Sequence, residues 1–84
     1  MSDFHTYILY SESTDRYYTG STSRLSGRIE QHNNSKSPST KYGIPWIKVW
    51  SKQVASRSEA MKLEKKIKKR GAKRFLQDRD QYKS

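Results

Sequence analysis

Two short stretches of alternating residues near the N-terminus predict a pair of β-strands. Residues 4–11 and 17–22 are rich in β-branched and aromatic side chains, and polar turn-forming residues separate them. We therefore expect an antiparallel hairpin. Because side chains alternate along a strand, Tyr7 and Leu9 share one face of the first strand, and Ile8 lies on the opposite face.

A short helix is predicted after the hairpin, beginning at residue 23 or 24 and ending at residue 33 or 34. Leu25, Ile29 and His32 recur at helical spacing and form a narrow face toward the sheet. Arg28 lies four residues before His32, so both side chains can project from the same side of this helix.

The middle of the chain is predicted to be a loop followed by a third strand. Residues 35–45 are rich in Ser, Lys, Gly and Pro, a composition typical of surface loops. Residues 46–54 alternate well enough to form a strand, which would place Trp46 and Trp50 on one face. The two tryptophans then either pack under a helix or form a surface for a partner.

A second helix is the best-marked element of the chain. Ser56 and Glu59 have the spacing of a capping box at its start, and Gly71 is a suitable stop. Glu64 falls among the apolar positions of this helix, where a carboxylate is costly unless something compensates its charge. Those apolar positions are Ala60, Leu63 and Ile67.

The last apolar residues complete the predicted fold. A short final helix over about residues 73–79 would pack Phe75 and Leu76 onto the core. The elements together predict an α/β fold of the α+β type, a small three-stranded antiparallel sheet flanked by helices. The whole chain, residues 1–84, is expected to form a single domain.

Composition and charge narrow the possible partners. Hydrophobic residues make up only 31% of the 84 residues, so the core is small. The net charge of +10, from 18 basic and 8 acidic residues, favours nucleic acid as partner, with ribosomal or membrane-surface adhesion as the alternative. There is no cysteine, no signal-peptide pattern and no apolar run near the roughly 20 residues of a bilayer span. We expect a soluble cytoplasmic protein that does not span a membrane and has no obligate protein partner.

The positive charge is concentrated near the second helix. Residues 57–74 contain nine basic and two acidic side chains, so this segment carries +7 of the net charge. Such density is typical of a surface that follows nucleic-acid phosphates, although a solvated lysine face would look similar. The predicted nucleic-acid contacts are Lys62, Lys65, Lys66, Lys69, Arg70 and Lys73.

Tyrosines are frequent in the predicted hairpin. Tyr10 and Tyr17 are expected simply to pack against each other. Tyr7 and Tyr18, in contrast, can lie close together near the helix that bears Arg28 and His32. Gly20 would permit the close approach of a ligand or of a helix.

In order and spacing, these residues resemble the GIY-YIG nuclease family. The resemblance rests on Tyr7, ten intervening residues, Tyr18-Thr19-Gly20, and then Arg28, His32 and Glu64. It extends from about Thr6 to Phe75 and is strongest for the small stand-alone bacterial members. The first motif keeps only its tyrosine, the second has Thr19 where isoleucine is usual, and no residue matches the additional C-terminal asparagine of the family. A competing register would use Tyr10 instead of Tyr7, but Tyr7 fits the motif separation better.

This resemblance implies a metal-dependent endonuclease that hydrolyses phosphodiester bonds in DNA, with RNA as the less favoured substrate. Glu64 would hold one divalent metal ion, Mg²⁺ or else Mn²⁺, and Arg28 would neutralise charge on the phosphate. Tyr7 would orient or deprotonate the attacking water with support from Tyr18, and His32 would share the proton transfer. Because the usual pKa of tyrosine is about 10, Tyr7 would need nearby positive charge to act as a base.

Two other functions fit the same sequence. The chain could be a binding module of this fold that holds nucleic acid through its lysine-rich helix and cuts little or nothing. It could also be an interaction protein whose Trp46 and Trp50 form a partner surface. For His32 taken alone, a structural role inside its helix is an alternative to catalysis.

Overall fold

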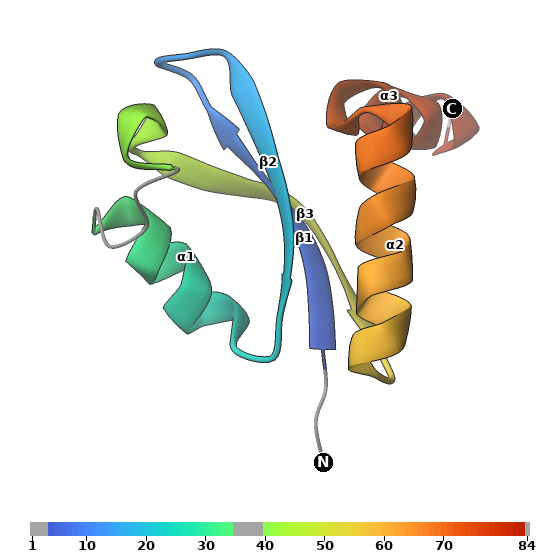
Figure 1. Ribbon diagram of the computed structural model, residues 1–84. Helices are drawn as coiled ribbons and strands as arrows, with labels where there is room; N and C mark the ends of the chain where they lie inside the picture. The colour runs from blue at the N-terminus through green and yellow to red at the C-terminus, as the bar shows by residue number, and fades with distance from the viewer. Residues whose placement is uncertain (1–3, 35–39, 84) are drawn as a thin grey trace.

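The computed structural model describes residues 4–34 and 40–83, and within them a three-stranded sheet is flanked by three α-helices (Figure 1). The elements are β1 (Phe4–Ser11), β2 (Arg16–Thr22), α1 (Leu25–Asn33), the 3-10 helix η1 (Lys41–Gly43), β3 (Trp46–Val54), α2 (Arg57–Arg70) and α3 (Ala72–Lys83). The predicted α+β fold class is confirmed. Among residues 4–34 and 40–83, none of the helices combines the length and the hydrophobicity of a membrane-spanning segment.

The sheet has the order β2-β1-β3, and both pairings are antiparallel. Helix α1 covers one face, whereas α2 and α3 cover the other (Figure 1). In the hairpin, Tyr7 pairs with Gly20, Leu9 with Tyr18, and Tyr10 with Tyr17. The hairpin was therefore predicted correctly, and its register brings the two motif tyrosines close together.

Alternation along β1 divides the core into two layers. Tyr7 and Leu9 are buried on the α1 face together with Trp46, where Leu25 and Ile29 of α1 pack against them. On the opposite face, Thr6 donates a hydrogen bond to the carbonyl of Ala60 in α2, at 2.9 Å. Ile8, Ala60 and Ile67 are also fully buried. The sequence predicted this division from the period of two.

Helix α2 begins and ends as its sequence predicts. The Ser56 hydroxyl accepts a hydrogen bond from the backbone N–H of Glu59 at 3.2 Å, and Gly71 ends the helix with a φ of 95°. Helix α3 follows at once and runs to Lys83, so it is longer than the predicted 73–79 helix. Arg70 forms two hydrogen bonds with Asp78, at 2.9 and 3.0 Å, which tie α2 to α3.

A β-bulge in β3 corrects the prediction for the two tryptophans. Ile8 pairs with Trp50 and Leu9 pairs with Lys48, so one extra residue lies between these partners. The alternation is therefore reset within the strand. Trp46 is buried on the α1 face, whereas Trp50 packs edge-on against Phe75 of α3 with ring centroids 5.0 Å apart. The expectation that both tryptophans share one face was wrong, and the proposed two-tryptophan partner surface is lost with it.

The segment predicted as a loop over residues 35–45 is only partly described. Residues 35–39 lie outside the described part of the chain. The remainder contains η1, so a short helical turn replaces the expected irregular loop. Trp46 at the start of β3 is held to the end of α1, because Asn33 accepts from its backbone N–H at 2.6 Å and donates to its carbonyl at 3.0 Å.

Replacing Gly27 with alanine should stabilise the protein. Gly27 lies inside α1, and a Cβ at this position would meet no atom within 4 Å. Because glycine in a helix interior costs about 1 kcal/mol relative to alanine, we expect the free energy of unfolding to rise by roughly that amount. Urea denaturation followed by circular dichroism measures the change. Gly20→Ala is the control that should destabilise, and an unchanged or lower midpoint for Gly27→Ala would contradict the prediction.

Candidate active site

Gly20 and Ser21, near the end of β2, contact candidate site residues on opposite faces of the sheet. On the α1 face the Tyr7 ring lies over Gly20, where a Cβ would be only 2.7 Å from the Tyr7 hydroxyl oxygen. On the α2 face the Ser21 hydroxyl donates to Oε1 of Glu64 at 2.8 Å. A ligand or helix was expected to approach Gly20, but the space beside it is filled by the ring of Tyr7. Residues 20 and 21 thus contact the tyrosine on one face and the carboxylate on the other.

The Tyr7 hydroxyl is part of a buried chain of hydrogen bonds. It lies 3.2 Å from Nε2 of His32, and Nδ1 of His32 lies 2.9 Å from the hydroxyl of Thr40. Tyr7, His32 and Thr40 are each at most 1% exposed. If Nδ1–H donates to Thr40, Nε2 is free to accept the proton of Tyr7. This geometry gives His32 a defined partner on each side.

Tyr18 completes the aromatic wall around His32. Its ring centroid lies 4.8 Å from that of His32 and 6.3 Å from that of Tyr7. Tyr10 and Tyr17 pack together as expected, with ring centroids 4.9 Å apart, and the Tyr10 hydroxyl donates to Asp15 at 2.8 Å. Of the two candidate motif tyrosines, the structure thus brings Tyr7 to His32, and Tyr10 to Asp15.

Burial determines the protonation states of Tyr7 and His32. It raises the pKa of Tyr7 to about 12, with repulsion from Tyr18 adding to the shift, while a hydrogen bond and the positive charge of Arg28 oppose it. Burial also lowers the pKa of His32 from its usual 6.5, and the charge of Arg28 acts in the same direction. At neutral pH Tyr7 is therefore a phenol and His32 a neutral imidazole. Positive charge does lie near Tyr7, as expected, but burial outweighs it.

Arg28 lies at the solvent-exposed side of this group. Its side chain is exposed and donates to Oε1 of Gln31 at 3.3 Å, and its positive charge acts on Tyr7 by opposing the rise in the pKa of that residue. A hollow of about 260 Å³ lies beside it and is also lined by Arg24 and Gly27. Two guanidinium groups at one exposed hollow are well suited to hold a phosphate.

Glu64 is held by partners on both carboxylate oxygens. Oε1 accepts from Ser21, and Oε2 forms an ion pair with Nζ of Lys68 at 2.8 Å. These contacts compensate the free-energy cost of placing a carboxylate among the apolar positions of the helix. Glu64 also acts on Tyr7, because its negative charge contributes to the raised pKa of that hydroxyl.

The donor set fits a lightly coordinated divalent metal ion. Mg²⁺ commonly binds one or two carboxylates and completes its shell with waters and substrate phosphate, and Glu64 offers such a carboxylate at the surface, 23% exposed. Residues 4–34 and 40–83 hold no group of three or more His, Cys, Asp or Glu that could bind a metal. A metal at this site would therefore depend on Glu64 and on the phosphate. Lys68 is 57% exposed, so its ammonium can move away from Oε2 at little cost.

The predicted nucleic-acid contacts are spread around α2 and the start of α3. All are exposed: Lys62, Lys65, Lys66, Lys69, Arg70 and Lys73. Lys62 and Lys65 line a hollow of about 400 Å³ together with Glu64. Lys66 lies on the side of β3, in a hollow shared with Lys52. Arg70 forms an ion pair with Asp78 at 2.8 Å. The structure thus brings Lys62 and Lys65 to the carboxylate and does not gather all six residues on one face.

Three residues near the site were missed in the sequence. Lys68 could have been found, because it follows Glu64 by four residues on a predicted helix. Ser21 directly follows the second motif, but a single serine gives no signal by itself. Thr40 lies in a segment without periodicity, and only the folded chain places it beside His32.

Known proteins share the sequence pattern and the fold of this chain. The family model of the GIY-YIG catalytic domain matches residues 3–77. Among solved structures, the chain resembles the solution NMR structure of a UPF0213 protein from Bacillus halodurans, with 28% sequence identity and a TM-score of 0.54. That match covers 89% of this chain and 80% of the other. No protein with a curated description matches the sequence significantly.

Proposed function

The chain belongs to the GIY-YIG family, whose members are nucleases, and from this premise we propose that it is a divalent-metal-dependent endonuclease that hydrolyses phosphodiester bonds in DNA. One observation carries the proposal. The Tyr7 hydroxyl lies against Gly20 and the Glu64 carboxylate is bonded to the adjacent Ser21. The proposed proton-transfer group and the proposed metal ligand therefore contact adjacent residues of β2, on opposite faces at the edge of the sheet.

Each residue has a role that its surroundings support. Arg28 binds the phosphate from the exposed side and neutralises the charge that grows on its oxygens in the transition state. Tyr7 positions the attacking water and accepts its proton while passing its own to Nε2 of neutral His32. Thr40 fixes the tautomer of that imidazole, and Tyr18 packs against it.

Bond changes follow from these roles. A P–O bond forms to the water oxygen, and the P–O bond to the leaving sugar oxygen breaks. At the end of this step the proton taken from the water resides on Tyr7 and the former Tyr7 proton resides on His32, and the leaving oxygen gains a proton from solvent. Glu64 would hold a divalent metal ion, which would supply Lewis-acid stabilisation of the phosphate and of the leaving oxygen.

A second candidate is a binding module that holds DNA but does not cut it. The observation that favours it is the ion pair at Glu64, because Lys68 occupies the oxygen Oε2 that a metal would need. In this function the exposed lysines of α2 bind phosphates, and Glu64 serves only to anchor the helix to Ser21.

Cleavage by the purified protein decides between the two. Labelled single-stranded, flapped and fully paired oligonucleotides are incubated with Mg²⁺ or Mn²⁺, and in parallel with EDTA. Metal-dependent cutting of any of these substrates supports the nuclease. Salt-sensitive binding without cutting on all of them, with either metal, would overturn the nuclease in favour of the binding module.

Removing two lysines next to Glu64 should weaken DNA binding in a salt-dependent way. Each phosphate contact contributes about 0.7–0.9 to the slope of log affinity against log salt, so Lys62→Ala with Lys65→Ala, the two lysines that share a hollow with Glu64, should reduce the slope by about 1.5. Fluorescence anisotropy in EDTA at several salt concentrations measures this slope.

The control for this prediction removes the same charge elsewhere. Lys48 in β3 and Arg57 at the start of α2 are both exposed. Replacing them with alanine should change the slope much less. Equal losses in the two double variants would mean that the protein attracts DNA by net charge alone, without a preferred surface.

A further inference from the structure

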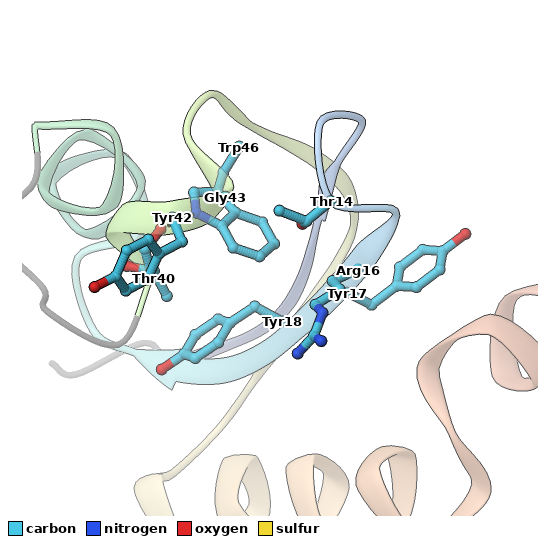
Figure 2. A pocket seen from close by; sticks show the side chains of 8 residues that line it. All are labelled: Thr14, Arg16, Tyr17, Tyr18, Thr40, Tyr42, Gly43 and Trp46. Carbon is cyan, nitrogen blue, oxygen red and sulfur yellow. Dashed lines mark hydrogen bonds between the residues drawn. The ribbon is translucent and has the colours of Figure 1, made fainter.

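An aromatic pocket adjoins the catalytic group of Tyr7, Tyr18, His32 and Thr40, and it shares Tyr18 and Thr40 with that group. It has a volume of about 560 Å³, within the roughly 300–1,000 Å³ range of ligand pockets. Figure 2 shows Trp46, Tyr42 and Tyr18 around its open centre, with Arg16 beside Tyr18. The start of β2, the η1 segment and the start of β3 contribute these side chains.

The floor of the pocket is firmly held. Trp46 is 7% exposed, and its indole Nε1–H donates to the carbonyl of Thr40 at 2.7 Å. Asn33 binds both backbone groups of Trp46. Gly43 lets the indole pack flat, because a Cβ at that position would collide with its ring.

The rim of the pocket is different in character, since it is exposed and positively charged. Tyr42 is 79% exposed, which is unusual for a large aromatic side chain, and the ammonium of Lys41 lies 5.5 Å from its ring centroid. Arg16 is also exposed. An accessible ring beside cations is the combination that binds a nucleobase by stacking and its phosphates by charge.

The pocket is continuous with the catalytic group in two ways. Tyr18 belongs to both, because its ring centroid lies 4.8 Å from that of His32 and 6.2 Å from that of Trp46. Thr40 also belongs to both, since its hydroxyl contacts His32 and its carbonyl accepts from Trp46. A ligand in the pocket would therefore lie directly beside the residues that act on the phosphate.

We propose that this pocket binds one unpaired nucleobase of the nucleic-acid strand next to the phosphate that is cut. The base stacks on Tyr42 and the exposed side of Tyr18, above Trp46, and Arg16 holds a neighbouring phosphate. The inference rests on the proposed function, and it adds a class of substrate. A paired base cannot enter without leaving its stack, so strands with unpaired nucleotides at the cleavage point are favoured over perfect duplex.

Binding in EDTA tests the pocket without requiring cleavage. The probes are a fluorescent thymidine oligonucleotide and a tetrahydrofuran oligomer of equal length, which has the same phosphates but no bases. We expect the wild type to bind the thymidine probe about tenfold more tightly, the order expected for one stacked base. Tyr42→Ala should remove this difference by weakening only the thymidine complex, whereas Tyr42→Phe, which keeps the ring, should retain it. Arg16→Ala should weaken both complexes alike.

Other outcomes are equally clear. Equal affinity of the wild type for the two probes would overturn the pocket as a base site. A Tyr42→Ala variant that loses affinity for both probes by the same factor would also overturn it. A protein that prefers the thymidine probe through Tyr42 but never cuts DNA would lose the nuclease and keep the base site. A protein that cuts single-stranded and paired DNA equally well, and binds the two probes with equal affinity, would keep the nuclease and lose the base site.

Discussion

Replacing Glu64 with glutamine should reduce cleavage by roughly 1,000-fold, because the site loses the carboxylate proposed to hold its metal. Lewis-acid stabilisation contributes several kcal/mol to the transition state, and 1.36 kcal/mol corresponds to about tenfold in rate. The amide oxygen of glutamine can still accept the hydrogen bond of Ser21. Lys68 loses its ion pair but is 57% exposed, so the fold should tolerate the change.

The measurement compares single-turnover cleavage of the Glu64→Gln protein with that of wild type, together with DNA binding in EDTA. Binding should be retained, since the variant removes negative charge. Glu59→Gln is the matched control, because it makes the same change on the same helix but at its N-terminal cap. Cleavage should be unchanged in that control. A Glu64→Gln protein that cuts at the wild-type rate would place the metal elsewhere.

Local signals in the sequence predicted most of the fold. The cap at Ser56, the stop at Gly71 and the apolar period of α2 are properties of adjacent residues, so no tertiary information is needed to find them. The bulge in β3 is different. Val49 is the extra residue, because Ile8 pairs with Trp50 and Leu9 with Lys48. Only the pairing of β3 with β1 reveals this, and the sequence of β3 alone contains no sign of it. Trp46 and Trp50 were therefore assigned to the same face.

The same distinction applies to the candidate site. The spacing of Tyr7, Tyr18 and Gly20 identifies the hairpin residues, and the structure brings them together. What the spacing cannot give is burial, which raises the pKa of Tyr7 even though Arg28 is near. It also cannot give Thr40, whose contact with His32 is a tertiary contact that no local pattern marks. The roles of all these residues remain predictions that the variants test.

Replacing Tyr7 with phenylalanine should reduce cleavage by about 10²- to 10⁴-fold, the usual contribution of a general acid–base group. Phenylalanine keeps the ring that packs over Gly20 and removes only the hydroxyl that contacts His32. The loss of that buried hydrogen bond should lower the free energy of unfolding by about 1 kcal/mol. Tyr10→Phe is the control, because Tyr10 lies on the other face with Asp15 and should not affect cleavage.

The pH dependence of wild-type cleavage shows how Tyr7 acts. If neutral His32 takes the proton that Tyr7 passes on, the rate falls only when His32 becomes protonated. Burial lowers its pKa, so this acid limb lies below pH 6.5 and the rate is flat above pH 7. If Tyr7 acted instead as a phenolate, its pKa of about 12 would make the rate rise about tenfold per pH unit through the alkaline range. A rise of that kind, or an acid limb unchanged in His32→Asn, would contradict the transfer from Tyr7 to His32 and leave Tyr7 as a base on its own.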